Sequence, residues 1–107
     1  MFCKKGTVEK KQLLEGVHLR TLVYGEKTLM GQFSIAKGSA IPPHSHPHEQ
    51  VTYIVEGEVL FFLGEEKQRL NPGDMVAIPA NLPHSIQLVS AHVRLIDSFT
   101  PLRQEFL

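Results

Sequence analysis

The 107-residue chain is 42% hydrophobic and 21% charged, which predicts one globular domain spanning residues 1–107. Its 11 basic and 11 acidic residues cancel, and it lacks the positive stripe typical of proteins that bind nucleic acid or anionic membranes. A single cysteine, Cys3, excludes an intrachain disulfide, and no apolar run suits a membrane span or secretory signal, so we expect a cytoplasmic protein.

Short runs rich in β-branched and aromatic residues, separated by glycine and proline, predict strands along most of the chain. Near the N-terminus, residues 9–15 (EKKQLLE) indicate a single helical turn. The predicted strands then follow in chain order at 21–25, 28–36, 51–56, 58–63, 74–79, 84–89 and 92–99. Turn residues separate them, for example Glu56-Gly57. Strands of this length and spacing predict an all-β sandwich or small barrel.

The segment 59–63 (VLFFL) is apolar at every position, whereas a strand with one face in water should alternate. A second sheet layer or a partner subunit must therefore cover its outer face. We predict that a second copy of the chain does so and that the protein is a homodimer.

Residues 42–50 (PPHSHPHEQ) place histidines at every second position. Side chains two residues apart on an extended segment point to the same side, so His44 and His46 can bind one ion together. A proline distorts the backbone beyond them, and spacing alone does not choose the next ligand among His48, Glu49 and Gln50. The alternative is a solvated histidine-rich loop without a metal.

Both motifs of the cupin family occur in this chain, which resembles a cupin over nearly its whole length. The first, G-x5-H-x-H-x3,4-E-x6-G, is met by Gly38, His44, His46 and Gly57, with Gln50 in the glutamate position. The second, G-x5-P-x-G-x2-H-x3-N, is met by Gly73, Pro79 and His84, with Asn81 and Leu88 as departures. The resemblance implies a cupin-type conical β-barrel, also called a double-stranded β-helix or jelly roll, with its core at about residues 28–100. It also implies one divalent metal bound by His44, His46, Gln50 and His84.

The predicted ligand set has a chemical consequence. Three imidazoles and a neutral amide leave the two positive charges of the ion uncompensated. Such an ion is a stronger Lewis acid than one with a carboxylate ligand, and it favours stabilising an anion. Imidazole-dominated ligation disfavours calcium and magnesium, so we expect a transition metal: zinc, nickel, iron, manganese or copper.

The last predicted strand carries a second candidate group. Val93, Leu95, Asp97 and Phe99 share one face, which is apolar apart from the carboxylate. A buried carboxylate is costly unless paired, so we interpret Asp97 as an acid–base group facing the metal, with a raised pKa. The alternatives are a bond from Asp97 to a turn, or a shifted register. Arg103 can present a planar fork to a carboxylate at the barrel mouth, or it is an ordinary surface arginine.

The combination of HSHPHEQ with the C-terminal IDSFTPLRQEFL resembles the KdgF cupins of pectin and alginate breakdown. The resemblance implies conversion of 4,5-unsaturated monouronates, which are small sugar acids, into open-chain 5-keto-4-deoxyuronates. It assigns the pocket roles to Asp97, Phe99 and Arg103. The alternatives are a metal-dependent polyketide cyclase, a non-catalytic cupin that binds sugar acids, and an iron dioxygenase.

Overall fold

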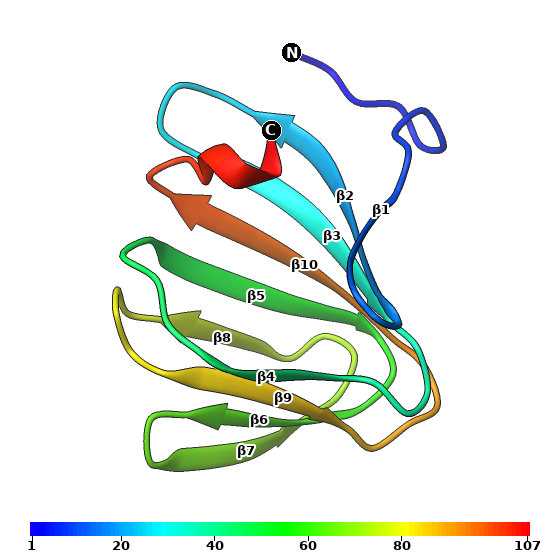
Figure 1. Ribbon diagram of the computed structural model, residues 1–107, viewed down its shortest axis with the longest axis vertical. Helices are drawn as coiled ribbons and strands as arrows, with labels where there is room; N and C mark the ends of the chain where they lie inside the picture. The colour runs from blue at the N-terminus through cyan, green and yellow to red at the C-terminus, as the bar shows by residue number, and fades with distance from the viewer.

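The computed structural model describes residues 1–107 and is almost entirely β-structure (Figure 1). Its strands are β1 (Lys11–Leu14), β2 (Val17–Tyr24), β3 (Leu29–Ile35), β4 (Ala40–His44), β5 (Glu49–Glu56), β6 (Val59–Leu63), β7 (Glu66–Leu70), β8 (Met75–Ile78), β9 (His84–Leu88) and β10 (Val93–Thr100). A 3-10 helix, η1 (Gln104–Phe106), follows β10, and no helix is long or apolar enough to cross a membrane.

The strands form two antiparallel sheets that enclose the core. One sheet has the strand order β1-β2-β3-β10-β5-β8, and the other has the order β4-β9-β6-β7. The large sheet contributes Leu95 and Phe99 to the core, and the small sheet contributes Phe61 and Ile86. Burying each such side chain stabilises the fold by about 1.5–3 kcal/mol.

All seven predicted strands are present, with their ends shifted by a few residues. The helical turn predicted at residues 9–15 is wrong, because residues 11–14 form the exposed strand β1 paired with β2. A two-residue turn, Glu15-Gly16, joins the two strands, and Gly16 has a positive φ (+74°), which glycine adopts without steric cost. Backbone pairing with β2 therefore outweighs a weak helical pattern.

Three strands lie outside the sequence prediction, and all three are edge strands: β1, β4 and β7. β4 contains Pro42 and Pro43, which have no N–H to donate and are tolerated at a sheet edge. β7 (EKQRL) is mostly charged and exposed, which is typical of an edge protected against further pairing. These three edge strands lack the apolar alternation on which the prediction depends.

The outer face of β6 is less exposed than its sequence suggests. Leu60 and Phe62 point away from the core yet are half-buried. Arg69 and Lys67 lie directly opposite them on β7, where their aliphatic stems can cover part of this face. The homodimer remains a prediction.

Candidate metal centre

The small sheet and the loop after β4 bring three histidines together. His44, at the end of β4, pairs with His84, at the start of β9. His46 lies in the loop between β4 and β5. One ring nitrogen from each of the three lies within 4.8 Å of the other two. Residues distant in sequence thus offer three nitrogen atoms to one point in space.

Hydrogen bonds select the ring nitrogen that each histidine presents. In His44 and His84, Nδ1 lies 2.9 Å from the carbonyl oxygen two residues earlier. In His46, Nδ1 lies 2.9 Å from the carbonyl oxygen of His48. A carbonyl only accepts, so each Nδ1 carries the proton and each Nε2 keeps a lone pair. This is the tautomer that binds a metal through Nε2.

The surroundings also favour the uncharged form of His44 and His84. Burial, followed by the nearby His44, His46 and Arg103, lowers the pKa of His84 to about 4, against the opposing hydrogen bond to the carbonyl of Leu82. Burial likewise lowers the pKa of His44. Nε2 of His84 is buried and has no hydrogen-bond partner. A buried acceptor without a donor is costly, and a bound cation would remove that cost.

Gln50 places an oxygen beside these nitrogens. Its Oε1 lies 2.9 Å from Nε2 of His46, so two lone pairs face each other with no proton between them. Two ligand atoms about 2.1 Å from one ion would lie about 3.0 Å apart at a 90° angle and about 3.4 Å apart at a tetrahedral angle, so the observed separation is short enough for both atoms to bind one ion. The donor set therefore fits a single divalent ion, which His44, His46, Gln50 and His84 would hold.

A buried hydrogen-bond chain holds the amide of Gln50 in this orientation. Its Nε2 donates to Oγ1 of Thr52 at 3.0 Å, and the hydroxyl of Thr52 donates to Oδ1 of Asp97. Since the nitrogen is engaged by Thr52, the amide oxygen faces His46. Sequence reasoning missed Thr52, although its position two residues after Gln50 places both on the inner face of β5.

The structure places Asp97 on the inner wall of the barrel, with 5% of its surface exposed. Burial raises its pKa to about 7, while hydrogen bonds from Thr52 and Gln50 and the charge of Arg103 oppose the rise. A carboxyl group with this pKa exists in both protonation states near neutral pH. It can therefore accept a proton and return one.

Arg103 is held at the barrel mouth by aromatic rings. Its guanidinium carbon lies 4.2 Å from the ring centroid of Phe106 and 5.0 Å from that of Phe99. Its Nε donates to Glu105 at 2.7 Å. Phe106, which sequence reasoning missed, is buried and packs edge-on against Phe99. The last residues of the chain thus orient Arg103 while its terminal nitrogens stay available.

These groups line one cavity of about 330 Å³. His44, Gln50, His84, Asp97 and Arg103 form its polar side, with Phe99 beside them. Apolar residues form much of the remainder: Leu13, Leu14, Val17, Phe33 and Ile41 among them. His48 does not line the cavity, and its backbone carbonyl is what contacts the site.

Comparison with known proteins agrees with this geometry. The Cupin domain family matches residues 31–99. The pectin degradation protein KdgF of Dickeya dadantii is 29% identical over 98 residues, which is 91% of this chain and 89% of that protein. Quercetin 2,3-dioxygenase of Bacillus subtilis is 32% identical over 87% of this chain, but the chain spans only 29% of that enzyme's length.

The structure of KdgF from a Halomonas species superposes with a TM-score of 0.94 at 25% identity, covering 100% of both chains. The jelly roll implied by the sequence motifs is therefore confirmed. The chain belongs to the cupin family and resembles the small cupin KdgF.

Proposed function

We propose that the protein is a metal-dependent enzyme that opens 4,5-unsaturated monouronates to 5-keto-4-deoxyuronates during pectin or alginate breakdown. The observation that carries this proposal is Asp97, a buried carboxyl group with a pKa of about 7 in the same cavity as His44 and His84. A binding module would gain nothing from so costly a buried acid. The similarity to KdgF along nearly the whole of both chains supports the substrate class.

His44, His46 and His84 through Nε2, and Gln50 through Oε1, are the residues that would hold the ion. A divalent ion there supplies positive charge for an oxygen that becomes negative during the reaction, with no carboxylate ligand to neutralise it. The remaining tasks belong to the side chains of the cavity.

Asp97 would move the proton. The ring oxygen of the substrate belongs both to a hemiacetal and to an enol ether. Ionised Asp97 takes the proton of the anomeric hydroxyl, and the bond from C1 to the ring oxygen breaks. This leaves an aldehyde at C1 and an enolate at C5. The carboxylic acid so formed returns the proton to C4, which yields the 5-ketone, and its pKa near 7 suits both steps.

Arg103 would bind the carboxylate of the substrate. Because Nε is engaged by Glu105, the terminal nitrogens are the donors left for a ligand. Stacking on Phe99 and Phe106 restricts the guanidinium plane, so less entropy is lost when the carboxylate binds. Phe99 also packs edge-on against His46, and it would shape the wall of the cavity beside the substrate.

The decisive experiment follows the conjugated absorbance of an unsaturated monouronate mixed with the metal-loaded protein. The absorbance should fall, a chelator should stop the loss, and added metal should restore it. Asp97→Asn keeps the size of the side chain, so it should retain metal yet slow the reaction by about 10²–10⁴-fold. A metal-loaded wild-type protein that leaves the substrate unchanged would refute the proposed reaction.

A specific observation favours a second candidate, a cupin that acts as a metal-dependent polyketide cyclase. The apolar side of the cavity, which includes Leu13, Phe33 and Ile41, offers few hydrogen bonds to a sugar acid. The same surface would bury the hydrocarbon part of a polyketide. Enolate stabilisation is common to both reactions. Turnover of an enolisable aromatic polyketide, with the uronate unchanged, would favour the cyclase.

A further inference from the structure

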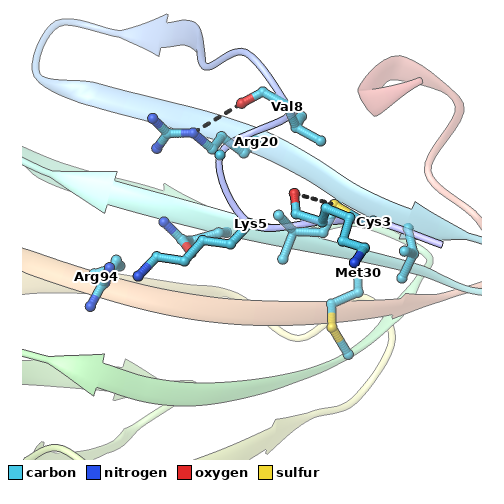
Figure 2. A pocket seen from close by; sticks show the side chains of 11 residues that line it. Cys3, Lys5, Val8, Arg20, Met30 and Arg94 are labelled. Carbon is cyan, nitrogen blue, oxygen red and sulfur yellow. Dashed lines mark hydrogen bonds between the residues drawn. The ribbon is translucent and has the colours of Figure 1, made fainter.

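The largest cavity of the molecule, about 550 Å³, lies outside the barrel (Figure 2). It is on the outer face of the large sheet, where residues 3–8 lie across β2, β3 and β10. We name it the outer cleft. It shares no lining residue with the cavity of the metal centre, so whatever it binds does not occupy the proposed active site.

The lining of the outer cleft is strongly positive in a chain with no net charge. It contains the cations Lys4, Lys5, Arg20 and Arg94, and no acidic residue. One of the four has a carboxylate partner, since Nη2 of Arg94 lies 3.3 Å from Oε2 of Glu56. The Nε–H of Arg94 is buried and donates to no acceptor. The cleft thus holds an excess of donors and positive charge that its own residues do not balance.

The register of the sheet directs these donors toward a common region. Arg20 on β2 lies opposite Gln32 on β3, and Arg94 on β10 lies opposite Ser34, two positions along the same strand. All four side chains are on the outer face. Because β3 separates the two arginines and they are offset by two residues along it, their backbones are about 12 Å apart, which two long side chains can span. Gln32 also lines the cleft.

The N-terminal segment closes the cleft from above. Residues 4–7 form a tight turn in which both the backbone N and Oγ1 of Thr7 donate to the carbonyl oxygen of Lys4, at 3.2 and 2.6 Å. Gly6 has φ +81°, as the third residue of a type II turn requires. Nε of Arg20 donates to the carbonyl of Val8 at 3.2 Å and anchors the segment to the sheet. Figure 2 shows Lys5 and Arg94 extending toward the same end of the cleft.

We propose that the outer cleft is a binding site for a small organic polyanion, either a phosphate ester or a compound with paired carboxylates. Guanidinium groups bind such oxygens through two parallel hydrogen bonds, and the lysine ammonium groups balance the remaining charge. Met30, Leu22 and Val23 provide an apolar wall for the organic part of the ligand. The site is independent of the proposed reaction, and its test does not depend on uronate turnover.

The test is calorimetric titration of the 107-residue protein at 0.15 M salt with three probes: inorganic phosphate, pyrophosphate and citrate. We expect saturable binding of pyrophosphate, citrate or both, with one site per chain. Arg20→Gln and Arg94→Gln should each weaken that binding about tenfold or more, because each removes a charge-assisted contact. The control is Arg69→Gln, which removes an arginine of β7 that pairs with Glu58 and lies outside the cleft; it should bind as the wild type does.

Limited trypsin digestion provides an independent readout. A bound polyanion should hold the N-terminal turn in place and slow cleavage after Lys4 and Lys5, while cleavage after Lys27, in the loop between β2 and β3, should be unchanged. Circular dichroism of each variant establishes that it is folded. Binding by pyrophosphate alone would identify a phosphate ester site, and binding by citrate alone a polycarboxylate site. The proposal is overturned if no probe binds saturably, or if folded Arg20→Gln and Arg94→Gln proteins both bind like the wild type.

Discussion

Replacing Thr52 by Val tests whether the buried chain from Asp97 orients a metal ligand. Valine keeps the shape of threonine but has no hydroxyl. Thr52 is 2% exposed, and its Oγ1 accepts from Gln50 at 3.0 Å and donates to Asp97. Without it, the amide of Gln50 can turn its NH₂ group toward His46, and Asp97 loses a donor.

The expected magnitude follows from these contacts. Two buried polar groups lose a partner at a cost of about 1–3 kcal/mol each, so the free energy of unfolding should fall by at least about 2 kcal/mol. Removing a group that orients a metal ligand typically weakens metal affinity by about 10–100-fold. Thr52→Val should therefore be less stable and bind zinc more weakly than the wild type.

Zinc affinity is measured by competition with a chromophoric chelator, and stability by denaturant unfolding of the metal-free protein. Thr52→Ser is the matched control, because it keeps the hydroxyl and removes one methyl group, worth about 0.8 kcal/mol. Its zinc affinity should remain close to that of the wild type. A folded Thr52→Val protein with wild-type zinc affinity would show that Thr52 does not orient Gln50.

Three further predictions concern the same site. His84→Ala should lose most of its metal. His48→Ala should keep its metal, because His48 contributes only its backbone carbonyl to the site. Full metal occupancy in the purified His84→Ala protein would contradict the ligand assignment. Arg103→Lys should raise KM for the uronate more than it lowers kcat, since an ammonium cannot present two parallel donors, and an unchanged KM would place the substrate carboxylate elsewhere. The third prediction concerns the metal-free protein between about pH 4 and 6.5. In this range His84 is protonated in the unfolded chain but not in the folded one, so its contribution to stability rises with pH. Asp97 is protonated in the folded chain but not in the unfolded one, so its contribution to stability falls as pH rises. Asp97→Asn should leave the His84 effect unopposed and steepen the rise by up to about 1.4 kcal/mol per pH unit, and denaturant unfolding with an unaltered slope would rule out the raised pKa of Asp97.

The interior strands and their inward faces could be predicted from the chain because burial imposes a local pattern. Along β10, Val93, Leu95, Asp97 and Phe99 alternate with partly exposed residues, and the structure buries all four. The edge strands β1, β4 and β7 carry no such pattern. Pro42 and Pro43 in β4, like the charged residues of β7, are acceptable there because one side of an edge strand needs no backbone partner.

For the site, the sequence by itself determined which residue types were available: imidazoles two apart, an amide in place of a carboxylate, and an inward carboxyl group. Spacing did not choose among His48, Glu49 and Gln50. Tertiary structure favours Gln50, since it buries Gln50 with its oxygen beside His46, leaves Glu49 exposed, and brings only the backbone carbonyl of His48 to the site.

Long-range strand pairing is the physical reason for the difference. β4 pairs with β9 in the register that sets His44 opposite His84, and β5 pairs with β10 in the register that sets Thr52 opposite Asp97. A local pattern reports which face of a strand is buried, but not which strand lies beside it or in which register. The candidate histidine ligands could therefore be named from their residues and motif spacing, whereas the hydrogen-bond chain from Asp97 to Gln50 exists only once the sheets have formed.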